Sequence, residues 1–386
     1  MSIRADAIVI GGGVVGLATA LALRQAGLNV VIVERGVCGG EASWAGAGIL
    51  SPANPHRHDL VQELQTAALD RYPAYCQSLT DATGVDPEYE RCGWLDLLTT
   101  DQEVRMAQSD VRAAADQQTP DGQPIYEMLT PDEAVALEPN LSRNCLAVLH
   151  CRRTGQVRSP RLLQALRIAC ERADVGIREQ TEVAEIELAG QTVAGVRTTD
   201  DVRIAAERIV ICAGAWSARI GPTTIGQLLP VMPVKGQIVL AQCPARPIQR
   251  IINRGKGYLV PRRDGHVIIG ATDEPDAGFD KRNTARGINR LIDDAVTMVP
   301  SLADAPVVAT WAGLRPGSPD GRPYIGPVPE FENLFAATGH FKNGLTLAPI
   351  TAEIIRDLIV TGQCAFDLSR CAPGRPAKLD RSNRGT

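Results

Sequence analysis

Hydrophobic residues near the start of the chain form two continuous runs with a helically spaced run between them. Residues 7–10 and 29–33 are continuous apolar stretches, which are typical of buried strands. Residues 17–25, between them, have the spacing of a helix. A strand, a helix and a second strand joined by short connections predict a βαβ unit with a parallel sheet.

The turn between the first strand and the helix reads GGGVVG over residues 11–16, and the second strand ends at Glu34. This G-x-G-x-x-G pattern, with an acid after the next strand, is typical of dinucleotide binding. The glycines allow the tight turn, the approach of a pyrophosphate and the packing of helix on strand. The alternative is a glycine turn in another α/β protein, and the complete context favours the dinucleotide. The predicted contacts are Gly11, Gly13, Val14, Val15, Gly16 and Glu34.

The pattern further along predicts helices alternating with strands, and then a group of consecutive strands. Asp264 and Gly265 separate two apolar runs and predict a tight hairpin. We expect it in an antiparallel sheet with one face to solvent and one to the active site. The strands are expected at 93–98, 146–150, 177–179, 183–187, 193–198, 206–212, 229–242, 257–263, 266–272, 307–312 and 333–338. The helices are expected at 60–82, 101–118, 130–138, 159–173, 283–298 and 346–359, with a further helix start after residue 213.

Composition narrows the classes of partner. The chain has 386 residues, of which 44% are hydrophobic, and a net charge of −4. That charge gives no general attraction to nucleic acid or to an anionic membrane, and no apolar run reaches the length of a membrane span. Residues 1–6 lead directly into the first strand, so we expect no signal peptide. The ten cysteines include no C-x-x-C pair, which favours reduced thiols and a cytoplasmic protein. The five histidines lack metal-ligand spacing.

Several motifs together resemble one family. The small-residue loop 36–49 follows the acidic strand, and four later segments read GYLVPR from residue 257, WAGLRPG from 311, DGRPYIG from 320 and GHFKNG from 339. These segments resemble the amine-oxidising branch of the FAD-dependent oxidoreductases, which includes glycine oxidase, sarcosine oxidase and D-amino acid oxidase. The likeness extends from residue 7 to about residue 358 and is strongest to the glycine oxidases.

The resemblance implies an α/β fold in which a Rossmann-like FAD-binding domain is interleaved with an antiparallel-sheet α+β substrate domain. The FAD-binding domain is expected at 1–88, 145–228 and 305–366, and the substrate domain at 89–144 and 229–304. Residues 367–386 are expected to form a loose polar tail. A homo-oligomer is also implied, because the family forms homotetramers.

The resemblance also implies further FAD contacts, including a backbone contact from Val183 to adenine. Relatives with covalently attached flavin carry a histidine in the segment matching 43–48 or a cysteine near residue 315. This chain has neither, so noncovalent FAD is expected. His340 lies in the turn that contacts flavin, with packing as the alternative to catalysis. Besides the first-turn residues, the implied FAD contacts are Arg35, Ala42, Ser43, Ala47, Gly48, Ile49, Val183, His340, Phe341, Lys342, Asn343, Gly344, Leu345 and Thr346.

Three residues are implied to bind substrate. In the family an arginine at the position of Arg315 binds the substrate carboxylate, for which a guanidinium is well suited because it donates two parallel hydrogen bonds. Tyr258 matches a tyrosine that holds the same carboxylate, with a core tyrosine as the alternative. Lys342 stands where glycine oxidases can carry arginine. It is expected to bind carboxylate less well, to contact flavin, to assist oxygen reduction, or to be a structural surface lysine.

The implied activity is oxidative deamination of glycine, sarcosine or small D-amino acids, with oxygen as acceptor and hydrogen peroxide as product. In the family this reaction supplies iminoglycine for the thiazole of thiamine. Hydride transfer from substrate to flavin needs orientation more than acid–base groups, so no catalytic base is named. An amino-acid dehydrogenase that reduces a quinone is one alternative. A non-catalytic flavin-binding protein is another.

Overall fold

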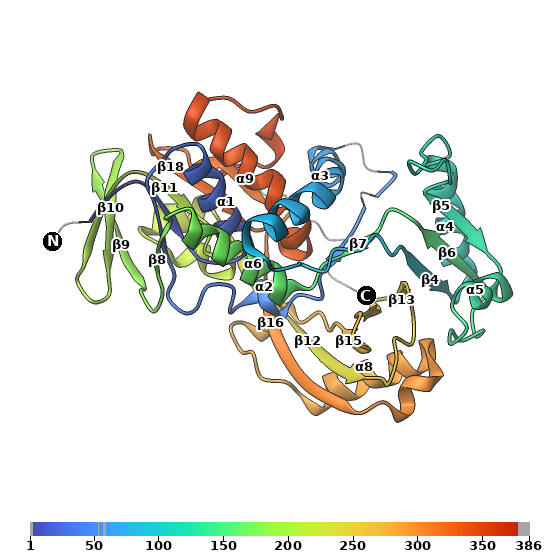
Figure 1. Cartoon of the computed structure of the whole chain (residues 1–386). Helices are drawn as coiled ribbons and strands as arrows, with labels where there is room; N and C mark the ends of the chain where they lie inside the picture. Colours follow the sequence, from blue (N-terminus) through green and yellow to red (C-terminus); the bar gives the residue numbers. More distant parts are fainter. Residues whose placement is uncertain (1–2, 53, 57–58, 377–386) are drawn as a thin grey trace.

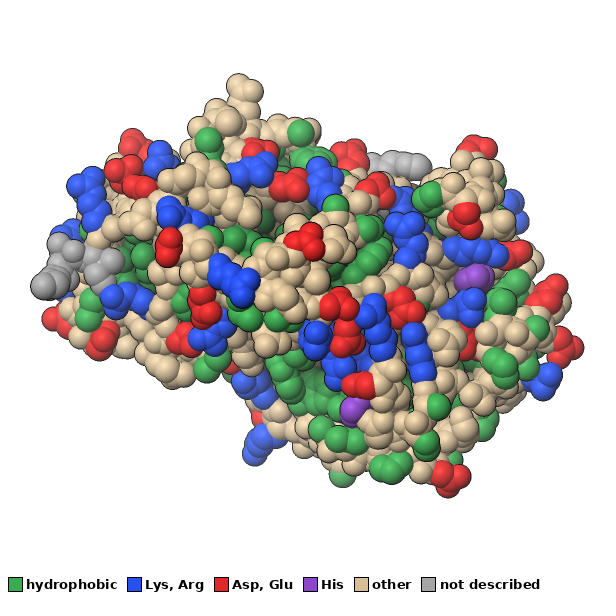
Figure 2. Space-filling view, viewed as in Figure 1, with side chains coloured by type: hydrophobic (Ala, Val, Ile, Leu, Met, Phe, Trp, Pro, Cys, Tyr) green, Lys and Arg blue, Asp and Glu red, His purple; other side chains and the backbone are tan. Residues whose placement is uncertain are grey.

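The protein is described by a computed structural model that covers residues 3–52, 54–56 and 59–376. Two eight-stranded sheets, each with its own helices, make up the fold, with the hairpin β9–β10 extending at one end (Figure 1). The sheets combine a mainly parallel and a mainly antiparallel arrangement, which confirms the expected fold class. Figure 2 shows basic and acidic side chains interspersed over one face, in agreement with the small net charge.

The first sheet contains the predicted βαβ unit at its centre. The order is β17-β18-β11-β1-β2-β8, and all neighbours except β17 and β18 are parallel. The hairpin β9–β10 pairs with β11 in the antiparallel sense. The strands are β1 (Ile3–Ile10), β2 (Val30–Val33), β8 (Gly176–Arg178), β9 (Val183–Ala189), β10 (Thr192–Thr198), β11 (Arg203–Ile211), β17 (Tyr324–Pro327) and β18 (Leu334–Thr338).

Four helices cover one face of this sheet, and their apolar sides form the largest core. Tyr72 and Leu64 are fully buried in it. The opposite face packs against the β9–β10 hairpin and the short helix α7 (Thr223–Leu228). Burial on both faces explains why strands β1 and β2 are continuously apolar. The covering helices are α1 (Val14–Gln25), α3 (Leu60–Thr83), α6 (Ser159–Arg172) and α9 (Gly344–Thr361).

The second sheet has the order β16-β12-β15-β14-β13-β4-β6-β5, and only the β13–β4 pair is parallel. Its strands are β4 (Trp94–Leu98), β5 (Tyr126–Leu129), β6 (Ala147–Cys151), β12 (Met232–Gln242), β13 (Ile251–Arg254), β14 (Gly257–Pro261), β15 (His266–Gly270) and β16 (Val307–Gly317). Its helices are α4 (Asp101–Ala113), α5 (Pro131–Leu137) and α8 (Ala285–Met298). The predicted hairpin forms between β14 and β15, where Gly265 has φ +87°.

Both faces of the second sheet are covered, so the expected solvent-facing side is wrong. Val239, Leu259 and Ile269 pack against α8, while Ile238, Val260 and Ile268 on the alternate positions face Ala47 of the first domain. The alternation of the sequence correctly predicted that successive side chains point to opposite faces of the sheet. It could not show that the amphipathic helix α8 covers the face expected to meet solvent.

Sheet membership also differs from the expected domain boundaries at two places. Residues 147–151 pair with β4 and β5, and residues 307–317 pair along their whole length with β12, so both belong to the second sheet. The strand expected to end at residue 312 continues through Pro316. A proline fits there because β16 is the edge strand, where a missing backbone N–H breaks no ladder. The division into domains otherwise stays a prediction.

Shorter elements fill the connections. They are α2 (Ala42–Ala45), β3 (Ile49–Leu50), which pairs with β7 (Gly155–Gln156), and the 3₁₀ turns η1 (Gly214–Arg219), η2 (Pro275–Ala277), η3 (Pro300–Asp304), η4 (Phe341–Asn343) and η5 (Leu368–Arg370). The helix start expected after residue 213 is therefore a 3₁₀ turn. Among the described residues, no helix combines the length and the apolar character needed to cross a membrane.

The expected loose tail is wrong for residues 367–376. Cys371 is fully buried, and the guanidinium of Arg375 donates two 2.8 Å hydrogen bonds to the Asp320 carboxylate. Arg375 also stacks 3.9 Å over the ring of Tyr324. Polar composition suggested exposure, but a paired arginine is buried readily. The rest of the expected tail, residues 377–386, lies outside the described residues.

The buried pair of Arg375 and Asp320 should contribute to stability. Arg375→Ala should lower the free energy of unfolding by about 3 kcal/mol, because it leaves a buried carboxylate without its partner. Urea unfolding of the full chain measures this. The exposed Arg370→Ala should change it by less than about 0.5 kcal/mol. Equal effects of the two substitutions would contradict the structural role of the pair.

Candidate active site

One continuous cavity of about 630 Å³ is lined by residues of both sheets. Its wall begins at the glycine turn after β1, continues along the small-residue loop and ends at β14, β16 and the start of α9. Most of the sequence-predicted site residues line it: Gly11, Gly13, Val14, Val15, Glu34, Arg35, Ala42, Ser43, Ala47, Gly48, Ile49, Val183, Tyr258, Arg315, His340, Phe341, Lys342, Gly344 and Leu345. Gly16, Asn343 and Thr346 are not on the wall.

The glycine turn is built by backbone contacts that exclude side chains. Gly11 has φ +108°, and a Cβ there would lie 2.5 Å from the carbonyl oxygen of Cys212. A Cβ on Gly16 would lie 1.9 Å from the carbonyl oxygen of Gly11, so Gly16 acts in helix packing and not on the wall. The first N–H of α1, from Val14, donates to Ser43 Oγ at 3.0 Å. The helix N-terminus therefore faces the cavity, where a phosphate is favoured.

Glu34 is already engaged by the backbone. Its carboxylate accepts hydrogen bonds from Gly12 N–H at 2.7 Å and from Gly36 N–H at 2.8 Å. These bonds hold the acid at the cavity wall, and a carboxylate has further lone pairs for the hydroxyl contacts expected from the sequence. Beside it, the guanidinium of Arg35 stacks 3.7 Å over the ring of Trp216. Trp216 lines the cavity and was missing from the predicted set.

The turn before α9 holds a buried histidine. His340 is 2% exposed, and its Nε2 lies 3.1 Å from Thr351 Oγ1. Burial lowers the pKa of His340 to about 4, so the imidazole is neutral at neutral pH. The next residue, Phe341, has φ +48°, an uncommon conformation for an aromatic residue. His340 is thus placed to pack and to shape the turn. As an uncharged imidazole at neutral pH, it has no proton to give as a general acid.

Arg315 and Tyr258 meet on the part of the cavity wall that the second sheet supplies, whereas the glycine turn belongs to the first sheet. Arg315 Nη1 donates to the carbonyl oxygens of Thr272 at 3.1 Å and Lys235 at 3.4 Å, and the Tyr258 hydroxyl is hydrogen-bonded to the same guanidinium. Burial raises the pKa of Tyr258, although the neighbouring Arg315 opposes this, and the phenol therefore stays protonated. Both side chains can then donate hydrogen bonds to one anion.

Two glycines of the second sheet make room for these side chains. A Cβ on Gly236 would lie 2.4 Å from Arg315 Nη2, and a Cβ on Gly270 would lie 2.6 Å from the Tyr258 ring. Glycine in a strand interior often marks such a close approach. That signal was present in the sequence, but which side chain would lie over each glycine depends on strand pairing.

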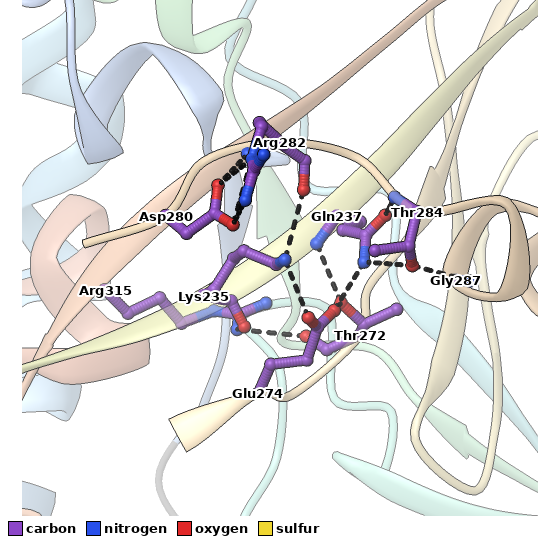
Figure 3. Close-up of polar contacts among 9 residues, drawn as sticks. All are labelled: Lys235, Gln237, Thr272, Glu274, Asp280, Arg282, Thr284, Gly287 and Arg315. Carbon is purple, nitrogen blue, oxygen red and sulfur yellow. Dashed lines mark hydrogen bonds and ion pairs between the residues drawn. The ribbon is translucent and has the colours of Figure 1, made fainter. Parts of the chain in front are cut away.

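An ion pair between the buried Lys235 and the partly exposed Glu274 lies beside the backbone that holds Arg315. Lys235 is 3% exposed, and its Nζ lies 2.9 Å from Glu274 Oε2 (Figure 3). Gln237 Nε2 donates to Glu274 Oε1 at 2.6 Å, and Thr272 Oγ1 donates to the same oxygen at 2.5 Å. Burial raises the pKa of Glu274, but the hydrogen bonds from Lys235, Thr272 and Gln237 outweigh it and lower the pKa below its usual value. The carboxylate is therefore ionised at neutral pH.

Lys342 contacts a residue that the sequence did not single out. Its Nζ lies 3.0 Å from Asp273 Oδ2, and Arg315 Nη1 lies 3.8 Å from Asp273 Oδ1. Asp273 also lines the cavity. An acid three residues past a strand end gives no distinctive sequence signal. Its position beside two basic residues from elsewhere in the chain is a consequence of the fold.

Comparison with known proteins shows the family to which the chain belongs. The family model described as FAD dependent oxidoreductase matches residues 6–358. The chain therefore belongs to that family of FAD-dependent oxidoreductases, which confirms the resemblance found in the sequence.

Within the family, the similar proteins include glycine oxidases. The glycine oxidase of Pseudomonas aeruginosa is 41% identical over 370 residues, which cover 95% of this chain and 98% of the relative. The crystal structure of glycine oxidase from Geobacillus kaustophilus superposes with a TM-score of 0.91 at 33% identity, covering 97% of this chain and 100% of that one. The bifunctional protein ThiO/ThiG of Synechocystis sp. is 35% identical over 370 residues, which cover 93% of this chain and 52% of the relative.

The residues present fit FAD. The turn at Gly11 has no side chain that would block a pyrophosphate, and the cavity continues past Gly48 to the turn at Lys342. Gly48 itself could not carry a Cβ, which would lie 1.9 Å from the carbonyl oxygen of Val157. A long cofactor held by backbone groups would therefore suit this cavity, and the N-terminus of α1 would be available to its phosphates.

The space over Gly236 should be necessary for the Arg315 side chain. Gly236→Ala should displace the guanidinium and weaken binding of acetate by about tenfold or more, since small misplacements of a binding group are costly. FAD content should be unchanged. Perturbation of the flavin spectrum measures acetate affinity. Gly257→Ala is the matched control, because its Cβ would meet neighbours only at 3.6 Å. Normal acetate binding by Gly236→Ala would show that Arg315 is not the anion site.

Proposed function

We propose that this enzyme oxidises glycine, sarcosine or small D-amino acids, giving the imine, the 2-oxo acid after hydrolysis, and hydrogen peroxide. The observation that carries the proposal is that Arg315 and Tyr258, on the second sheet, meet on the wall of the same cavity that the dinucleotide turn of the first sheet lines. A single carboxylated amine fits between such an anchor and a flavin. The names of the similar glycine oxidases support the same substrate class.

The chain contributes binding and orientation. Arg315 receives the substrate carboxylate, and the protonated Tyr258 donates a second hydrogen bond to it. Fixing the carboxylate also orients the amine and Cα of the substrate toward the start of α9. A substrate that is already bound and oriented avoids the entropic cost of bringing two reactants together in solution. FAD, when bound, supplies the two-electron acceptor and passes the electrons on to oxygen. The N-terminus of α9 faces the same place and favours negative charge there. We assign no catalytic base.

Further parts of the proposal rest on particular residues. FAD is held noncovalently, because Trp44 and Ala45 occupy the loop and no cysteine lies between Cys243 and Cys364. Val183 contributes a backbone contact to adenine. Lys342 acts as a secondary cation near the anchor. The enzyme works in the cytoplasm as a homo-oligomer, and the similarity to ThiO/ThiG supports a role in supplying iminoglycine for the thiamine thiazole.

Two other functions make different predictions. A dehydrogenase that reduces a quinone would show slow reaction of the reduced flavin with oxygen, which rapid mixing measures. A non-catalytic flavin-binding protein would not be reduced by any amine. Arg315 and Tyr258 argue against a non-catalytic flavin-binding protein, because such a protein has no need of a carboxylate anchor that faces the cavity.

Anaerobic glycine or sarcosine should bleach the flavin, and in air hydrogen peroxide should form. Absorbance of the purified yellow protein and a peroxide assay measure these reactions. Acid precipitation should release FAD into the supernatant, since no attachment residue is present. Reduction by 2-hydroxy acids but by no amine would reject the amine assignment, and colour remaining in the pellet would reject noncovalent FAD.

Arg315→Leu should weaken substrate binding. Losing one partner of a buried charge pair costs roughly 2–5 kcal/mol, so apparent affinity for glycine should fall by roughly 30-fold or more. FAD content should change little. Lys342→Ala should have a smaller effect, because Lys342 is 54% exposed and Arg315 only 19%. The reverse order of effects would exchange the two assignments, and no effect of either would place the carboxylate elsewhere.

A further inference from the structure

Asp273 bridges the two cationic side chains at the substrate end of the cavity. One carboxylate oxygen lies 3.0 Å from Lys342 Nζ, and the other lies 3.8 Å from Arg315 Nη1. All three residues line the cavity. A single carboxylate can reach both cations only if they face the same small space. The protein's own acid thus lies where a carboxylated ligand would meet the two cations.

The backbone on both sides of Asp273 is fixed. Glu274 N–H donates to the carbonyl oxygen of Lys235 at 2.9 Å, and Lys235 N–H donates to the carbonyl oxygen of Glu274 at 3.1 Å. On the other side, the Thr272 carbonyl accepts from Arg315, and the Thr272 hydroxyl accepts from Gln237 N–H at 2.9 Å (Figure 3). Because Thr272 and Glu274 are both held by hydrogen bonds, the backbone of Asp273 is fixed between them, and its partly exposed side chain reaches both cations from there.

The charges of these three side chains select the charge of the ligand. Arg315 and Lys342 carry two positive charges and Asp273 one negative charge, which leaves one positive charge to be neutralised. An amino acid with a neutral amine and one carboxylate supplies one negative charge. An amine with two carboxylates would bring its second carboxylate against Asp273 and its partner Lys342. Juxtaposed like charges across a binding surface are a common means of rejecting wrong partners.

We propose that Asp273 is a specificity-determining residue that restricts this enzyme to amines with a single carboxylate, by engaging Lys342 and repelling a second carboxylate. This inference rests on the proposed amine-oxidase function. In this proposal Lys342 lies beside Arg315, and its ammonium group is paired with the Asp273 carboxylate. Removal of the Asp273 charge frees Lys342 to receive a second carboxylate.

The test compares glycine with iminodiacetate, which is glycine carrying a second carboxymethyl group on nitrogen. Asp273→Asn keeps the size of the side chain and removes its charge. The ratio of kcat/KM for iminodiacetate to kcat/KM for glycine should rise about tenfold or more. Asp280→Asn is the matched control, since Asp280 lies on the same segment and pairs with Arg282 instead of with Arg315 or Lys342. Its ratio should equal that of the wild type.

Binding of anions that do not react gives a second readout that does not depend on turnover. The affinity for malonate relative to acetate, followed by flavin absorbance, should rise in Asp273→Asn and not in Asp280→Asn. The double substitution Asp273→Asn with Lys342→Gln should lose the gain, because the receiving cation is gone. Retention of the full gain would overturn the role given to Lys342.

The inference and the function on which it rests fail in different ways. If the wild type and Asp273→Asn both oxidise glycine, and their iminodiacetate and malonate ratios are equal, the inference is wrong and the function stands. If the wild type oxidises no amine, the function is wrong. In that case an increased malonate-to-acetate ratio in Asp273→Asn would still support the electrostatic selection at Asp273, and an unchanged ratio would overturn it.

Discussion

The site depends on how the guanidinium of Arg315 is held. It donates hydrogen bonds to the backbone carbonyls of Thr272 and Lys235 and is hydrogen-bonded to the Tyr258 hydroxyl, while its nearest carboxylate, Asp273, lies 3.8 Å away and pairs more closely with Lys342. Backbone carbonyls orient a guanidinium and leave its charge available to an external anion. Those carbonyls lie beside the ion pair of the buried Lys235 and the partly exposed Glu274, whose charges compensate each other. Such a pair is weak evidence for stability. Its position directly behind the anchor suits a role in orienting the backbone.

The second constraint is that the anchor and the dinucleotide turn belong to different sheets. The long pairing of β12 with β16 positions Arg315 where the second sheet meets the small-residue loop of the first domain. Across this contact, Trp311 Nε1 donates to the carbonyl oxygen of Ala45 at 3.1 Å. Gly313 also approaches closely, since a Cβ there would lie 2.6 Å from the Cβ of Ala45. These contacts tie the edge strand of one sheet to the small-residue loop of the other. These contacts therefore fix the position of the strand that carries Arg315 relative to the first sheet.

The charged side chains around Asp273 differ in their electrostatics from His340, although Lys342 lies in the same turn before α9 as His340. At the substrate end, charged groups contact one another within reach of a ligand, so ligand charge is the property that this end distinguishes. In the turn, His340 is buried with a lowered pKa and carries no charge at neutral pH. Family membership fixes the flavin chemistry, and we propose that Asp273 and Lys342 select the charge of the ligand on that scaffold. Similarity over nearly the whole chain is compatible with differences of this kind, because function depends on a few side chains of the site.

The sequence alone located the dinucleotide turn, and its resemblance to a family predicted Arg315 and Tyr258 as the substrate anchor. The turn is local, because Gly11 and Gly16 contact each other and the acid at Glu34 follows one strand later. Periodicity likewise located most helices and strands, and Thr130 with Glu133 marked a helix start that the structure confirms as a capping box. Tertiary structure alone decided that β16 continues through Pro316, that Arg375 docks on Asp320, and that Asp273 lies between Arg315 and Lys342. Each of these results joins residues far apart in the chain, and their contacts follow from strand pairing and burial, which local patterns do not specify.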